Sequence, residues 1–265
     1  MAANYLQERY IPTREETPIT YSDIAKFPRP GCSAPDSIAF SPDDSVITYL
    51  ASADGESLFR QLYAMDIESG TVRELCTPPT GTGEEENYSL EEKLRRERAR
   101  QLHTGITSYA WAEGAEGAGK MLVPVGNEMF VQEGLHAQLH RLFDPACLLA
   151  NAPQGKEGAV PPILDARISA DGKVVGFVWD RELYVVSTDC ESTPVKLTSS
   201  AAGTDLTNGL ADYIAQEEME RYEGYWISPD SSIVAFEQVD EGSVGVYRIM
   251  HLGSDKVGGS AQEEH

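Results

Sequence analysis

From residue 37 onward, short apolar stretches rich in β-branched residues alternate with polar turns. Three times the chain repeats one order: an apolar stretch, a Ser-Pro-Asp-like turn and a second apolar stretch, at 37–50, 166–178 and 224–236. The turns begin at Ser41, Ser169 and Ser228, and each has Asp two residues later. Proline suits the second position of such a turn, and the Asp side chain caps it. The pattern predicts strand–turn–strand units, each followed by a third strand, at 61–65, 182–186 and 244–248.

A fourth, degenerate copy lies between the first two. It consists of an apolar stretch at 106–111, a glycine-rich turn at 114–119 and two further stretches at 120–125 and 128–131. Repeated strand triplets are typical of β-propeller blades, and insertions between the copies explain their unequal spacing. The alternatives are an all-β sandwich and chance recurrence of turns. The predicted fold class is therefore all-β, a partial β-propeller of about four blades with short helical insertions.

The first 35 residues have a different character. They mix charged residues with five prolines, at positions 12, 18, 28, 30 and 35. Proline at this density prevents a long helix. We expect an extended lead-in over 1–35, with one short turn of helix near Tyr21–Ala25, followed by the propeller portion over 36–265.

A charged stretch at 84–104 has a helical pattern. Glu91 with Arg95 and Glu92 with Arg96 are i, i+4 pairs in the favourable orientation, and leucines supply an apolar side. Residues 95–100 form the basic cluster of an otherwise acidic chain. A solvated helix or a mobile insertion would have the same pattern.

A second helical pattern precedes the third Ser-Pro-Asp turn. Leu210, Tyr213 and Ile214 recur at i, i+3, i+4, and four residues further the same stripe reaches Glu217 and Glu218. We expect the helix to stop at Gly224. Adjacent carboxylates on a partly buried face repel each other unless a cation lies between them. The pattern is compatible with a receptor for an ammonium group or with a solvated helix end.

Composition limits the classes of partner. The chain has 265 residues, of which 41% are apolar, and its 43 acidic against 21 basic residues give a formal charge of −22. This charge repels the phosphates of nucleic acids and anionic membranes, so neither is an expected partner. Four dispersed cysteines and the lack of a 20-residue apolar run predict an intracellular, cytoplasmic protein with reduced thiols.

Several kinds of chemistry have no signal in the chain. It contains no G-x-S-x-G nucleophile elbow, phosphate-binding loop or dinucleotide fingerprint. His136 and His140 have a spacing that can hold a metal on a helix, but no third ligand accompanies them. We therefore expect no metal, no cofactor and no catalytic residues in this sequence.

Two motifs resemble one known family. The stretch Gln216–Trp226, Gln-Glu-Glu-Met-Glu-Arg-Tyr-Glu-Gly-Tyr-Trp, followed by Ser-Pro-Asp, resembles the double-glutamate motif of the dipeptidyl peptidase IV family. The stretch at 90–100 that leads to Gly105–Tyr109 is similar to the arginine-rich segment of that family. The resemblance looks closest to the cytosolic dipeptidyl peptidase 8/9-like and bacterial branches.

This resemblance implies a function and site residues. Members are serine exopeptidases that release dipeptides from free peptide N-termini. They act on peptides with proline or alanine next to the N-terminal residue, and they often form dimers. By resemblance, Glu217 and Glu218 would hold the α-ammonium of the peptide, and Arg100, or its neighbours Arg96 and Arg98, would contact a carbonyl. The chain resembles only an N-terminal piece with about half of an eight-bladed ring, without the hydrolase domain. We expect it to be inactive alone. The rival hypothesis is a non-catalytic propeller module that binds partner proteins.

Overall fold

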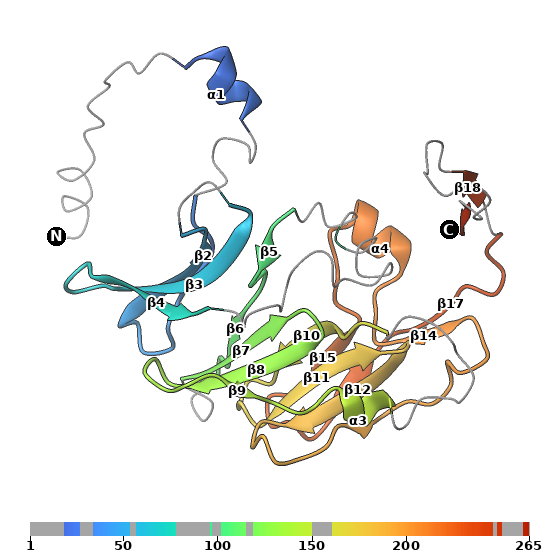
Figure 1. Cartoon of the computed structure of the whole chain (residues 1–265). Helices are drawn as coiled ribbons and strands as arrows, with labels where there is room; N and C mark the ends of the chain where they lie inside the picture. Colours follow the sequence, from blue (N-terminus) through green and yellow to red (C-terminus); the bar gives the residue numbers. More distant parts are fainter. Residues whose placement is uncertain are drawn as a thin grey trace.

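The computed structural model describes residues 19–26, 34–53, 57–77, 96, 102–114, 119–149, 161–245, 248–250 and 262–264 (Figure 1). Most of the described secondary structure is antiparallel sheet, and the helices are short. The helices are α1 (Tyr21–Ala25), α3 (Ala146–Leu149) and α4 (Tyr213–Glu218). The expected turn of helix at Tyr21–Ala25 is therefore present, and Thr20 and Asp23 close it with a capping box.

The strands form four consecutive sheets, which we call blades 1 to 4. Blade 1 contains β1 (Asp36–Phe40), β2 (Val46–Ala51), β3 (Phe59–Asp66) and β4 (Val72–Cys76) in sequence order, and the two-residue β5 (Thr104–Gly105) pairs with β3. Blade 2 contains β6 (Ala110–Trp111), β7 (Lys120–Val125), β8 (Glu128–Glu133) and β9 (His140–Arg141). Blade 3 contains β10 (Leu164–Ile168), β11 (Val174–Trp179), β12 (Glu182–Ser187) and β13 (Val195–Lys196). Blade 4 contains β15 (Tyr225–Ile227) and β16 (Val234–Phe236).

Two further strand pairs lie outside these blades. β14 (Leu206–Asn208) pairs with β17 (Gln238–Asp240), and β18 (Arg248–Met250) pairs with β19 (Gln262–Glu264). The expected third strand of the 224–236 unit, at 244–248, lies partly outside the described residues. Residues 244 and 245 belong to no strand, and β18, which starts at Arg248, pairs with β19. The alternation of apolar residues indicated a strand there, but pairing depends on residues far along the chain.

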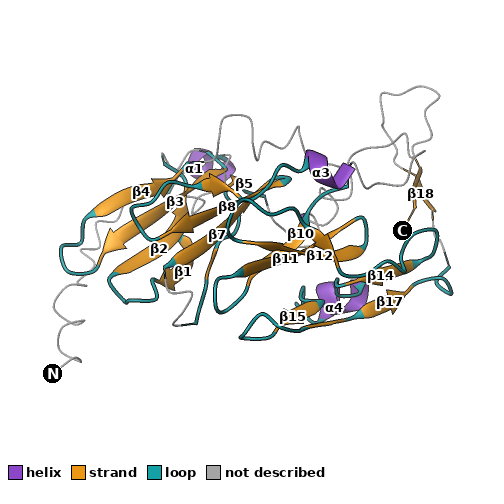
Figure 2. Cartoon of the chain, turned by 90° about the horizontal axis from the view of Figure 1, so that it is seen from below, coloured by secondary structure: helices purple, strands orange, loops and turns teal. Residues whose placement is uncertain are grey.

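Successive blades pack face to face, as Figure 2 shows from below. Leu50 and Leu62 of blade 1 share a buried cluster with Met121 and Val123 of blade 2. The opposite face of blade 2 packs on blade 3 through a larger cluster, which includes Phe177. Blade 3 then packs on blade 4 through Leu164, Val178, Leu183 and Tyr225. This serial packing of mainly antiparallel sheets, two of them four-stranded, is the arrangement of propeller blades.

All three Ser-Pro-Asp-like turns have the same geometry. In each, the serine hydroxyl donates to the aspartate two residues later, at 2.6 Å from Ser41, 2.7 Å from Ser169 and 2.6 Å from Ser228. The fourth residue has positive φ in each turn, 56° at Asp44, 68° at Gly172 and 59° at Ser231. The sequence repeat thus corresponds to a structural repeat that joins the first two strands of blades 1, 3 and 4.

A second repeated feature links the inner strands of neighbouring blades. The register of β1 on β2 and of β10 on β11 shifts at equivalent places, where Ser37 and Asp165 have positive φ. The hydroxyl of Tyr109 donates to the carbonyl oxygen of Ser37 at 2.5 Å, and that of Tyr225 to the carbonyl oxygen of Asp165 at 2.6 Å. Each tyrosine therefore fixes the bulge in the inner strand of the blade before its own.

The hydrogen bonds of the turns lead us to predict the pH at which the Asp230 carboxyl group titrates. Bonds from Ser228 and Ser232 lower the pKa of Asp230 to about 2 from its ordinary value of 3.8. A carboxyl group whose pKa is lower in the folded chain stabilises the fold above its unfolded pKa, and that contribution is lost as the pH falls towards 2. We expect an NMR titration of the Asp230 carboxyl carbon to have a midpoint about 2, and Ser228→Ala to move it upwards. A wild-type midpoint near 4 would contradict the shared turn geometry.

Candidate functional site

The predicted acidic motif begins with helix α4. Its N-cap is Asp212, whose side chain accepts a hydrogen bond from the N–H of Ala215 at 3.0 Å. The buried residue of the helix is Ala215, whereas Tyr213 and Ile214 are 55% and 56% exposed. The expectation that Tyr213 and Ile214 mark a buried face is therefore wrong. A helix of six residues needs little buried surface to be held, because its flanking segments anchor it.

Glu217 and Glu218 both belong to the last turn of α4, and both are exposed. The carboxyl end of a helix carries partial negative charge, so acidic side chains there are unfavourable and cations are favoured. No basic residue lies in that turn, and neither glutamate makes a hydrogen bond or ion pair with any residue that the structure describes. The two carboxylates thus form a negative end that a bound cation would stabilise.

The helix ends earlier than expected. It stops at Glu218, and the chain reverses at Glu220, which has a φ of 52° and so occupies the left-handed region without being glycine. The N–H of Arg221 then bonds to the carbonyl oxygen of Ala215 at 3.0 Å. Gly224 does not end the helix. It lies against the backbone of Leu210, where any Cβ would overlap, and so closes the base of the loop that carries α4.

Two arginines anchor that loop base. Arg167 of β10 donates to Glu223 at 2.6 Å and also pairs with Asp165. Arg221 donates to the carbonyl oxygen of Glu223 at 2.5 Å and pairs with Glu237 at 2.9 Å. Burial would lower the pKa of Arg167, but its bonds to the two carboxylates raise it overall. The α4 loop is therefore fixed to blade 3 on one side and to the segment after β16 on the other.

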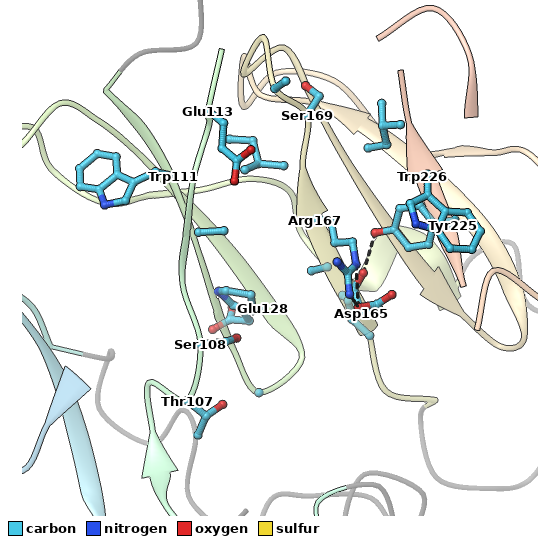
Figure 3. Close-up of a pocket in the computed structure, with 18 of the residues that line it drawn as sticks. Thr107, Ser108, Trp111, Glu113, Glu128, Asp165, Arg167, Ser169, Tyr225 and Trp226 are labelled. Carbon is cyan, nitrogen blue, oxygen red and sulfur yellow. Dashed lines mark hydrogen bonds and ion pairs between the residues drawn. The ribbon is translucent and has the colours of Figure 1, made fainter. Parts of the chain in front are cut away.

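A cavity of about 580 Å³ lies between the inner strands of blades 2, 3 and 4 (Figure 3). Figure 3 shows Arg167 pointing to Asp165, with the Tyr225 hydroxyl directed to the same residue. Glu113 and Glu128 from blade 2 and Trp226 from blade 4 also line it. Glu217 and Glu218 are not among its lining residues, although Tyr225 and Trp226 of the same motif are.

The arginine-rich segment can be placed only at one position. Arg96 is 7% exposed, lines the cavity and donates to the carbonyl oxygen of His103. Arg100, the expected carbonyl contact, lies outside the described residues, as do Arg98 and most of the predicted helix at 84–104. Neither that helix nor the role of Arg100 is tested, and both stay predictions.

Sequence reasoning missed Arg167 and Glu223. Arg167 is an arginine within a strand whose neighbours on both sides are apolar, which is a signal that its charge has a partner. Glu223 belongs to the acidic motif, but the sequence pattern gave no reason to assign it a role different from that of the other glutamates. Their pairing could not be predicted, because 56 residues separate them in the chain.

Two further findings concern ions and membranes. Within the described ranges, no group of three His, Cys, Asp or Glu side chains is arranged to hold a metal ion, and His140 lies in a strand, not on a helix. None of the described helices is long and apolar enough to cross a membrane.

Comparison with known proteins assigns part of this chain to a family. Residues 146–264 match the family model of the dipeptidyl peptidase IV (DPP IV) N-terminal region. The match covers a little under half of the 265-residue chain. The chain is also similar in structure to dipeptidyl peptidase 4 of Porphyromonas gingivalis, with a TM-score of 0.53 and 20% sequence identity over 86% of this chain. At that identity the likeness concerns the fold, and it confirms the partial propeller.

The matched family region contains blades 3 and 4 and the whole α4 loop. The resemblance to the DPP IV N-terminal propeller is thus confirmed, whereas the 8/9-like or bacterial branch stays a prediction. The chain spans 28% of the length of the Porphyromonas protein.

The close approach at Gly224 makes a prediction for this DPP IV-type loop. In Gly224→Ala, the added methyl group would collide with the backbone of Leu210, which cannot rotate away as a side chain can. We expect a loss of about 1–3 kcal/mol in the free energy of unfolding, measured by urea denaturation. The matched control is Gly245→Ala, where nothing lies within 4 Å of the added Cβ. Equal stability of the two variants would show that the loop base is not closed as described.

Proposed function

We propose that this chain is the substrate-recognition propeller portion of a DPP IV-like serine exopeptidase and binds the free α-ammonium of peptides. The observation that carries the proposal is the pair Glu217 and Glu218, two exposed carboxylates at the negative end of α4 without a described cationic partner. They lie in the region that matches the family. The anchored loop base supports the proposal, because a preorganised receptor loses less entropy on binding.

The chemistry of the pair suits an ammonium ion. An ammonium group has three N–H donors, and each carboxylate accepts several hydrogen bonds. Such charge-assisted bonds are each worth about 1.5–3 kcal/mol when sheltered from water. An acetylated N-terminus carries no positive charge, so the proposed site would select peptides with a free amino terminus.

The proposal gives the basic segment a second contact. An arginine of 95–100, with Arg100 as the expected residue, would orient a carbonyl of the bound dipeptide. Support comes from Arg96, which lines the cavity together with Trp226 of the acidic motif. Proline or alanine after the first residue is the preference that the family resemblance implies. Because no G-x-S-x-G elbow occurs in this sequence, the proposed role of this chain is recognition and not bond cleavage.

One observation favours a second function, a protein-binding module. Tyr213, Ile214 and Met219 are 55%, 56% and 67% exposed beside the two glutamates. Exposed apolar side chains around a charged centre are typical of protein interfaces. In that case the surface would bind a folded partner whether or not the N-terminus of the partner is free.

The carboxylate pair can be tested by binding. An Ala-Pro dipeptide amide and its N-acetylated form would be titrated into the isotope-labelled chain, with NMR shifts at Glu217 and Glu218 as the readout. We expect binding of the free amine alone, and a loss of at least about tenfold in affinity in Glu217→Gln and in Glu218→Gln.

Glu191→Gln is the control, because it removes one negative charge from an exposed residue of blade 3. Unchanged affinity in both motif variants would contradict the proposed function. Equal binding of the free and acetylated peptides would favour the protein-binding module.

A further inference from the structure

Glu182, the first residue of β12, is a buried carboxylate that the motif analysis did not use. It is 1% exposed. One of its oxygens accepts from the Thr198 hydroxyl at 2.5 Å and from the Asn208 side-chain amide at 2.9 Å, and the other from the N–H of Ala201 at 2.9 Å. Lys196 adds a distant charge contact at 3.7 Å. A buried carboxylate with this many donors fixes the groups around it, because any displacement breaks a charge-assisted hydrogen bond.

Asn208 is the most constrained of these donors. It is fully buried and belongs to β14, opposite Gln238 of β17. Its side-chain oxygen accepts from the Gln238 amide at 2.8 Å, while its backbone N–H donates to the Arg181 carbonyl oxygen at 2.9 Å. The Glu182–Asn208 pair thus connects blade 3 to the strand that precedes the α4 loop.

The chain between Asn208 and α4 has little freedom. Gly209 donates to the Glu237 carbonyl oxygen, and a Cβ there would lie 3.1 Å from Val178 and 3.2 Å from Leu183. Leu210 is bridged to Glu223, at the base of the loop. A displacement of Asn208 would therefore also displace the helix that begins at Tyr213.

We infer that Glu182, through its hydrogen bond to Asn208, is a positioning residue that holds α4 and so sets where Glu217 and Glu218 lie. The inference rests on the proposed function for its role in amine binding. It adds a residue that touches no ligand and lies outside the acidic motif. The buried pair adds a directional contact with blade 3 to the one that Arg167 makes with Glu223 at the base of the loop.

The pair allows a charge-conserving exchange. In Glu182→Gln, one acceptor oxygen becomes an NH2 donor. Whichever way the amide turns, its NH2 group opposes another donor, either the Asn208 amide or the N–H of Ala201, so one of these two hydrogen bonds is lost. Asn208→Asp alone places two carboxylates together. In the double variant Glu182→Gln/Asn208→Asp, the amide of residue 182 donates to the carboxylate of residue 208, and Gln238 still donates to it. The exchange restores the contact with reversed direction and unchanged net charge.

The first readout needs no ligand. Hydrogen exchange would be followed at the N–H groups of Ala215 and Gln216 in α4, which bond to the N-cap residue Asp212. The reference is the N–H of Leu142, which follows β9 and bonds to Met129 of blade 2. We expect both single variants to exchange at least about tenfold faster in α4, with Leu142 unchanged, and the double variant to return towards wild type. Equal acceleration at Leu142, no change in α4, or a double variant as perturbed as the single ones would overturn the inference.

The second readout is the affinity for the Ala-Pro dipeptide amide. We expect it to fall in the single variants and to recover in the double variant, in parallel with exchange in α4. If the wild-type chain does not bind the free amine, the proposed function fails, and the exchange data alone decide whether Glu182 positions α4. If α4 loosens while affinity stays at the wild-type value, the inference of a positioning role is wrong, whereas the proposed function stands.

Discussion

The apolar faces of the sheets cover one another, because the described helices are too short to cover a sheet. Each internal blade is buried on both faces, and the clusters between blades contain the largest fully buried side chains, such as Phe177 and Tyr225. A sheet face of this kind must lie against another apolar face to be stable in water. Because of this requirement each blade packs against the next one along the chain. The inner strands of blades 2, 3 and 4 then lie around the cavity.

Tyr225 shows how packing and site depend on each other. Its ring lies against Gly176 of β11, where an added Cβ would come within 2.6 Å, and its hydroxyl bonds to the Asp165 backbone. Burial raises its pKa well above the ordinary value, so it stays a neutral donor. The strand that contains Asp165, β10, also contains Arg167, which donates a hydrogen bond to Glu223. The contact between blades 3 and 4 thus places one end of the α4 loop.

Charge is distributed unevenly over this acidic protein. Arg167 and Arg221 are committed to acids at the base of the α4 loop, and the carboxylate of Glu182 is satisfied by buried donors. The other acids of the motif, Glu217, Glu218 and Glu220, face solvent, and the first two of them end the helix. Acidic side chains without a described cationic partner at the negative end of a helix make that end electrostatically suited to a cationic ligand.

The sequence alone determined the local features of this protein. The Ser-Pro-Asp turns, the strands beside them, the short helix α1 and the existence of α4 depend on neighbouring residues, so each could be predicted. The tertiary structure decided the rest. Gly224 resembles a helix stop in the sequence, but its role comes from the backbone of Leu210. The partners of Arg167 and Glu182 lie far along the chain, and their pairing depends on how blades pack, which no local pattern contains.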